Sequence, residues 1–186
     1  MAVTREDLAS LPLFAEVSDG MLDALLAQGR EARRAAGQVV ALEGDAWPEV
    51  AFLVRGLLRA RQTSLEGREY TLSYLGPGAC LNLAAALDGK PAVASLDALN
   101  EAVALCLAAD RLHRLMANDP ALAHAIARQL AADVRRLSGM VKSLALDTVR
   151  VRLARFLLSA AEAAPAQHRW TQESIAAQLG TVRDVV

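Results

Sequence analysis

The cysteines and histidines, which commonly bind metals or take part in nucleophilic catalysis, are few and widely spaced. The 186-residue chain has two cysteines, Cys80 and Cys106, and its three histidines, His113, His124 and His168, all follow residue 110. Two cysteines without a second pair or a CxxC motif encode neither a structural zinc site nor an iron–sulfur cluster. No Ser-His-Asp, Cys-His or phosphate-loop glycine motif is present. We therefore expect a protein that is not an enzyme.

The end of the chain carries a pattern that is typical of DNA binding. Thr171-Gln172-Glu173-Ser174 is a typical capped helix start, Gly180 would end that helix, and residues 181–186 would begin another. Two short helices around a glycine turn are typical of a helix-turn-helix. Taken alone, a helix-glycine-helix pattern also occurs in proteins that do not bind DNA.

Charge is distributed unevenly along the chain, and the part that carries this pattern is the basic one. Residues 1–110 hold 9 Lys and Arg against 15 Asp and Glu, whereas residues 111–186 hold 11 against 6, for net charges of −6 and +5. A basic second part is suited to a polyanionic partner, although solvated helix faces give a similar excess. The charged start of the chain and the lack of about 18 consecutive apolar residues predict a cytoplasmic protein with no membrane partner.

The elements that must position these residues follow from glycine spacing and apolar periodicity. Apart from a helical entry over the first thirty residues, glycines at intervals of seven to twelve separate short runs between Gly37 and Gly89, which predicts an antiparallel β-sandwich or roll. The expected strands are residues 39–42, 50–54, 57–63, 69–75, 92–98 and 102–107, with a hairpin turn at 65–68.

A long helix is expected from residue 118 to 144, with Asp119-Pro120 at its first turn. Apolar residues recur along it at alternating spacings of four and three, which is typical of a seam between two parallel helices. The expected dimer interface is Leu130, Val134, Leu137, Val141 and Leu144. Packing of this seam against the chain's own domain is the alternative. A second helix at 147–161 and a linker at 163–168 follow.

Together these segments resemble the Crp/Fnr family of bacterial transcription regulators over essentially the whole chain. The resemblance is carried by Leu11-Pro12-Leu13-Phe14, Gly37-Gln38-Val39-Val40 with Glu43-Gly44-Asp45, Phe52-Leu53-Val54-Arg55-Gly56, Glu66-Gly67-Arg68-Glu69 and Leu75-Gly76-Pro77-Gly78. It implies an α+β fold: an antiparallel, jelly-roll-like, cyclic-nucleotide-binding-like β-roll, a long dimerisation helix and an incomplete winged helix-turn-helix. The corresponding domains are residues 1–117, 118–145 and 146–186.

The stretch after Gly78 departs from the cAMP-responsive members of the family. Those members carry a glutamate for the ribose and an Arg-Ser pair for the cyclic phosphate, and here Leu83 and Ala92-Val93 stand in those places, with Lys90 as the only basic residue of the stretch. We expect no binding of cAMP in the usual way and an apolar pocket of small residues. The expected effector pocket is Gly78, Cys80, Leu81, Asn82, Leu83, Ala92 and Val93.

The identity of any cofactor stays open at this point. Haem is one hypothesis, for which Cys80 and Met116 could serve as axial ligands, because His113 and His124 fall on the helical connector and no histidine lies in residues 1–110. Core packing is the alternative role for Cys80 and Met116. The absence of histidine from the roll argues against a metal-dependent cupin enzyme.

The resemblance also implies how DNA would be bound. The residues expected to contact it are Thr171, Gln172, Thr181, Val182, Arg183 and Asp184. A homodimer would bind double-stranded DNA at an inverted-repeat operator, and contact with RNA polymerase is left open. The sequence stops at Val186 inside the expected recognition helix, so we expect a truncated form that binds DNA poorly. A dimeric β-roll that senses a small ligand or binds another protein, without binding DNA, is the alternative function.

Overall fold

The structure is a computed structural model that describes residues 2–163 and 170–181. The chain divides into two compact units. The first unit comprises Met1–Ala60 with Tyr74–Ala131, and the second comprises Arg61–Ser73 with Ala132–Val186. No helix among the described residues combines the length and the apolar composition needed to cross a bilayer.

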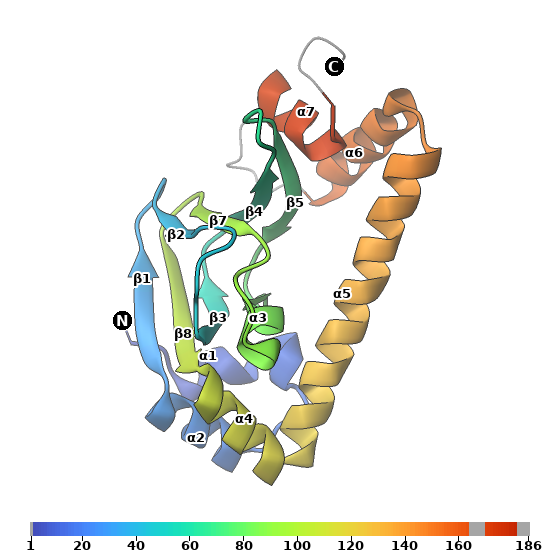
Figure 1. Ribbon diagram of the computed structural model, residues 1–186. Helices are drawn as coiled ribbons and strands as arrows, with labels where there is room; N and C mark the ends of the chain where they lie inside the picture. The colour runs from blue at the N-terminus through green and yellow to red at the C-terminus, as the bar shows by residue number, and fades with distance from the viewer. Residues whose placement is uncertain (1, 164–169, 182–186) are drawn as a thin grey trace. The chain divides into compact units, whose positions relative to one another are not determined.

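Figure 1 shows the elements in chain order. They are α1 (Arg5–Ala9), η1 (Pro12–Phe14), α2 (Asp19–Gln28), β1 (Arg30–Arg34), β2 (Val39–Ala41), β3 (Glu49–Arg55), β4 (Leu58–Thr63), β5 (Glu69–Leu75), β6 (Cys80–Leu81), α3 (Leu83–Asp88), β7 (Ser95–Ala98), β8 (Ala102–Ala108), α4 (Ala109–Asn118), α5 (Pro120–Leu146), α6 (Val149–Ala163) and α7 (Gln172–Leu179).

The strands form the expected roll of two four-stranded sheets. One sheet has the order β1-β8-β3-β6 and the other has the order β2-β7-β4-β5. Within the first sheet β8 pairs antiparallel with both β1 and β3, and β6 pairs antiparallel with β3. The antiparallel β-roll, and with it the α+β fold class, is therefore confirmed.

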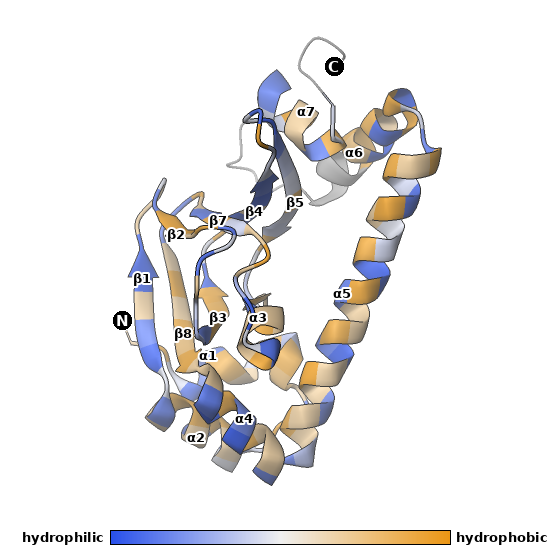
Figure 2. Cartoon of the chain, viewed as in Figure 1, coloured by the Kyte–Doolittle hydropathy of each residue, from blue (hydrophilic) through white to orange (hydrophobic). Residues whose placement is uncertain are grey.

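The core of the first unit lies between β3, β8 and the helices at one end of the roll (Figures 1 and 2). Residues 50–54 and 102–107 are buried without interruption, because one face of each strand lines the roll and the other is covered by helices. Phe14 of η1 and Phe52 of β3 meet edge to face, with ring centroids 5.0 Å apart. This packing fixes β3 and β8, which carry much of the site described below.

Three local features differ from the sequence-based expectation. Strand β1 is unexpected, because Arg30–Arg34 holds four charged residues and one alanine and lacks the apolar content that marks a strand. Strand β7 begins at Ser95 instead of residue 92. The stretch between β6 and β7 forms the short helix α3, which begins after Asn82 and ends at Gly89 in the left-handed conformation.

The long helix α5 begins where the sequence predicts and extends over 27 residues. The Asp119 carboxylate accepts hydrogen bonds from the backbone amides of Ala121 (2.8 Å) and Leu122 (3.1 Å), which satisfies two of the open donors at the helix start. Leu122 and Ile126 are buried in the core of the first unit. The first turns of the helix are therefore anchored to the roll.

The turn between β3 and β4 requires glycine, and this gives a test of the fold. Gly56 has φ +100°, and a Cβ there would lie 2.6 Å from the Cα of Ala102 and from the carbonyl oxygen of Glu101. Because both atoms belong to the backbone, we expect Gly56→Ala to lower the free energy of unfolding by about 2 kcal/mol or more. Urea denaturation monitored by circular dichroism measures this change.

Gly20 provides the matched control. It lies in α2, and a Cβ there would meet no atom within 4 Å. Gly20→Ala should leave the stability unchanged or raise it by up to about 1 kcal/mol, because alanine favours the helix. Equal urea midpoints for the two variants would contradict the described turn.

Candidate functional site

The interior of the roll contains a small cavity of about 30 Å³ that is partly open to solvent. It lies within the first unit, and its walls come from β1, β3, β6 and β8 of one sheet and from β2 and β4 of the other. The lining residues are Arg30, Ala32, Arg34, Val40, Trp47, Glu49, Ala51, Leu53, Leu58, Leu81, Ala102, Ala104 and Cys106.

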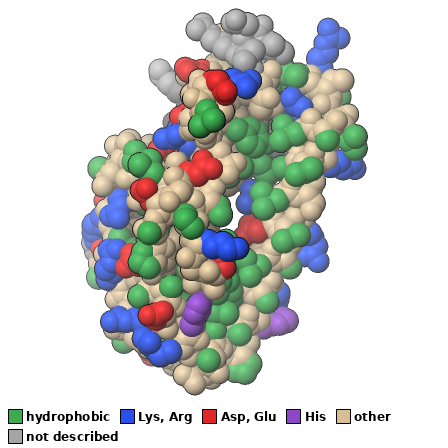
Figure 3. Space-filling view, viewed as in Figure 1, with side chains coloured by type: hydrophobic (Ala, Val, Ile, Leu, Met, Phe, Trp, Pro, Cys, Tyr) green, Lys and Arg blue, Asp and Glu red, His purple; other side chains and the backbone are tan. Residues whose placement is uncertain are grey.

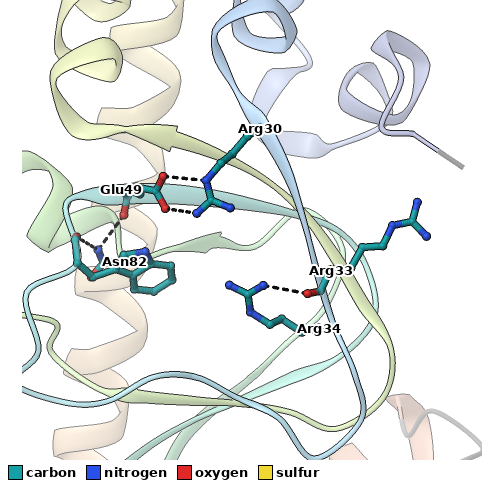
Figure 4. A network of polar contacts seen from close by, with 6 residues as sticks. Arg30, Arg33, Arg34, Glu49 and Asn82 are labelled. Atoms are coloured by element: carbon teal, nitrogen blue, oxygen red, sulfur yellow. Dashed lines mark hydrogen bonds and ion pairs between the residues drawn. The ribbon is translucent and has the colours of Figure 1, made fainter.

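Strand β1 supplies the basic groups of this cavity. Side chains alternate along a strand, so Arg30, Ala32 and Arg34 share the side that lines the cavity. Figure 4 shows Arg30 and Arg34 on one side of the strand and Arg33 on the other. Arg33 instead forms an ion pair with Glu31, at 2.8 Å between Nε and Oε1.

The Arg30 guanidinium is held by a two-bonded contact with Glu49 (Figure 4). Its Nε donates to Oε1 over 3.2 Å and its Nη2 donates to Oε2 over 2.6 Å. This contact raises the pKa of Arg30, although partial burial opposes the shift. Strand pairing sets the contact up, because β8 lies between the two strands and its Cys106 is opposite both Arg30 and Ala51.

Asn82 fixes the segment that carries Glu49. Its Nδ2 donates to the carbonyl oxygens of Trp47 (2.7 Å) and Glu49 (2.8 Å). Asn82 is also the one non-glycine residue with positive φ (59°) among the described residues. Asparagine tolerates this conformation better than most residues. Asn82 therefore helps to position the acidic wall of the cavity.

The Cys106 thiol lines the cavity beside these charges. Burial raises the pKa of the Cys106 thiol, and the nearby guanidinium groups of Arg30 and Arg34 oppose that rise. The thiol therefore remains protonated at neutral pH. It behaves as a small, weakly polar wall group.

The residues that the sequence analysis assigned to an effector pocket do not line one cavity in the structure. Of the seven, only Leu81 lines the cavity. Leu83 and Ala92 are buried elsewhere, Val93 is 59% exposed, and Cys80 lies opposite Phe52 in the β3–β6 pair. Lys90 forms an ion pair with Asp88 over 3.6 Å, and its side chain is 79% exposed. Their assignment to a pocket stays a prediction.

The cavity also differs from the expected apolar pocket of small residues. Its charged lining residues, Arg30, Arg34 and Glu49, come from outside the stretch 78–94, where the sequence analysis sought them. The only sequence signal was the alternation of arginines at positions 30 and 34 around Ala32. The candidate haem ligands Cys80 and Met116 do not line the cavity. No group of three metal-binding side chains occurs within residues 2–163 and 170–181.

A second candidate site is the apolar seam of α5. Leu130 packs against the core of the first unit, but the next four seam residues are exposed: Val134 by 62%, Leu137 by 43%, Val141 by 66% and Leu144 by 41%. Figure 3 shows hydrophobic side chains recurring along the surface of this helix. A row of exposed apolar residues at this spacing is typical of a surface that another helix covers.

The third candidate site is the turn at the end of α7. Thr171 Oγ1 accepts from the Ser174 amide (3.1 Å), and Ser174 Oγ accepts from the Thr171 amide (2.9 Å), which confirms the expected cap. Gly180 ends the helix with φ +66°, and the Thr181 amide donates to the carbonyl oxygen of Ala176. Gln172 begins α7, whereas Val182, Arg183 and Asp184 lie outside the described residues.

Comparisons with known proteins agree with this architecture. Residues 31–119 match the family model of the cyclic nucleotide-binding domain. The chain is 26% identical over 189 residues to a "CRP-like cAMP-activated global transcriptional regulator" of Mycobacterium tuberculosis, covering 97% of this chain and 84% of that protein.

Two solved structures show the same fold at lower identity. The c-di-GMP responsive global regulator CLP of Xanthomonas campestris superposes with a TM-score of 0.81 at 19% identity, covering 90% of this chain and 87% of that one. A structure described as a regulator of the crp/fnr family from Eubacterium rectale gives 0.78 at 18% identity, covering 94% and 82%. The chain therefore contains a region that matches the cyclic nucleotide-binding domain, and it is similar along nearly its whole length to a CRP-like regulator.

Proposed function

We propose that this protein is a homodimeric DNA-binding regulator in the cytoplasm, whose β-roll controls the binding of its helix-turn-helix to an inverted-repeat operator. The observation that carries the proposal is the capped helix α7 with its left-handed Gly180 turn, in a chain that is similar to a CRP-like transcriptional regulator. Thr171, Gln172 and Thr181 are proposed to contact phosphates. Val182, Arg183 and Asp184 are proposed to meet the DNA in the major groove.

The exposed seam of α5 supports the dimer. Four large apolar side chains on one stripe of a helix roughly 40 Å long favour association, because covering them removes apolar surface from water. The proposed interface is the seam from Leu130 to Leu144. Two parallel copies of α5 would set the two DNA-binding segments about one turn of DNA apart, as an inverted repeat requires.

We further propose that cAMP does not act on this protein in the usual way. Leu83 and Ala92, which stand where the cAMP-responsive members carry ligand-binding groups, are buried and apolar, and Val93 is exposed. Lys90 already forms an ion pair with Asp88 on the surface. A buried cyclic phosphate would therefore lack the charged fork that its desolvation requires.

The DNA-binding proposal is tested by selecting duplexes from a random library with the complete gene product and measuring affinity by fluorescence anisotropy at fixed salt. We expect enrichment of an inverted repeat with half-sites about one helical turn apart. Millimolar cAMP should leave the affinity unchanged within about twofold. A selection that enriches no inverted repeat would contradict the proposed function, and a strong gain with cAMP would contradict the effector argument.

The turn after α7 gives a sharper test. A Cβ on Gly180 would lie 2.9 Å from Leu144 Cδ2 and 3.2 Å from Tyr70 Cε2, in a backbone conformation that disfavours alanine. We expect Gly180→Ala to weaken operator binding about tenfold, because strain of roughly 1–2 kcal/mol falls on the helix-turn-helix. Gly139→Ala, where a Cβ meets nothing within 4 Å, should bind as the parent does.

The dimer is tested by placing a charge in the seam. Leu137→Asp should give monomers in light scattering, because dimerisation would bury an unpaired carboxylate between the helices. Ala132→Asp is the matched control, since position 132 lies on the opposite side of the helix at about 3.6 residues per turn. If Leu137→Asp keeps the dimer mass, the interface lies elsewhere.

A further inference from the structure

The charged wall of the roll cavity is the feature that the proposed function leaves unexplained. Strand β1 turns two arginines toward an interior that is otherwise lined mainly by alanine, leucine and valine. A guanidinium group near an apolar interior loses solvation and needs a hydrogen-bonded acceptor in return. The two arginines differ in the hydrogen-bond acceptors that the protein provides for them.

The charge of Arg30 is paired with a carboxylate of the protein. Its two hydrogen bonds to Glu49 pair one positive charge with one negative charge at the edge of the cavity. The Glu49 side chain is only 23% exposed, and Asn82 holds the backbone on which it is carried. The pair contributes no net charge to the cavity wall.

Arg34 has no such carboxylate partner in the part of the chain that the structure describes. Its Nη1 donates to the carbonyl oxygen of Arg33 over 2.8 Å, and among the described residues no carboxylate forms an ion pair with it (Figure 4). A guanidinium group has five N–H donors, so one neutral acceptor on the neighbouring residue leaves most of them open. Arg34 is half-buried and lines the cavity. The wall therefore carries one uncompensated positive charge.

The remaining walls define what such a charge would be used for. Apolar side chains of Ala51, Leu58, Leu81 and Ala104 line the cavity, and the indole of Trp47 lies at the same site. The enclosed volume is small, and the cavity is partly open to solvent. A fitting molecule has one negative charge at one end and a short apolar body.

We propose that this cavity binds a small monocarboxylic acid, with its carboxylate on the guanidinium of Arg34 and its apolar body among the alanines and leucines of the roll. A planar carboxylate matches the fork of a guanidinium group with two parallel hydrogen bonds. The single negative charge of the acid would neutralise the positive charge of Arg34. The proposal names the effector class of the proposed sensor and in that sense rests on the proposed function.

The test measures binding in the absence of DNA. Hexanoate and the uncharged hexanamide are titrated at constant ionic strength, and the fluorescence of the protein is followed because Trp47 lines the cavity. We expect a saturable change with hexanoate that Trp47→Phe removes, and binding of hexanamide at least about tenfold weaker. Equal affinities for acid and amide, or no saturable change, would overturn the proposal.

Two arginines of the same strand provide matched variants. Arg34→Gln should weaken hexanoate binding about tenfold or more, and Arg34→Lys should fall between it and the parent, because lysine keeps the charge but loses the fork. Arg33→Gln changes the outward side of β1 and should bind as the parent does. Equal losses in the Arg33 and Arg34 variants would overturn the assignment to Arg34.

The acid–amide comparison on the parent protein needs no variant, so it holds even where a substitution perturbs folding. Because no DNA is present, failure of hexanoate binding leaves the operator selection unaffected. Failure of the operator selection likewise leaves this binding measurement valid.

Discussion

The alternation of side chains along β1 is the constraint on which the site depends. Once Ala32 is buried against the roll, the pleat turns Arg30 and Arg34 to the same side, and a shift of one residue would instead turn Glu31 and Arg33 inward. Pairing of β1 with the buried strand β8 holds this register over five residues. The Arg30–Glu49 contact follows from it, since the same strand β8 sets the position of β3.

That contact serves the geometry of the site more than the stability of the protein. The Arg30 side chain is 57% exposed, so solvent screens the ion pair and its net contribution to stability is small. Removing one partner would nevertheless leave the other charge without its acceptor or donor at the cavity edge. The pair therefore fixes where Glu49 and Arg30 lie. Arg34 is then the charged group that lines the cavity without a carboxylate partner among the described residues.

Helix α5 shows a similar division between what the chain satisfies by itself and what it leaves open. Leu122 and Ile126 are buried in the first turns, whereas Val134 and Val141 are more than 60% exposed farther along the same stripe. The spacing of apolar residues does not change between the two halves. What changes is the supply of partner surface within the chain, which is why periodicity alone identifies a seam but not the molecule that covers it.

Much of the fold was predictable from local signals, and the cavity was not. Asp119-Pro120, Gly67 and the Thr171 cap act within a few residues, and the structure confirms the helix start, the hairpin turn with its positive φ and the capping box. The cavity depends on which strands pair and in what register, which joins Arg30 to Glu49 across 19 positions of the chain. The expected pocket at residues 78–94 rests on the resemblance to cAMP-responsive regulators and on no local signal in this stretch.

Because Arg34 lacks a carboxylate partner in the described part of the chain, binding of an anion to it would affect the stability of the roll. An anion that binds only the folded roll stabilises it in proportion to the logarithm of its concentration above the dissociation constant. β1 and β3 are both paired with β8, so an anion held between them would restrain three strands of the same sheet. An apolar residue at position 34 would avoid the desolvation of a charge. If the proposed anion binds, an arginine there would make the rigidity of the sheet depend on occupancy, which is the property that the proposed sensor requires.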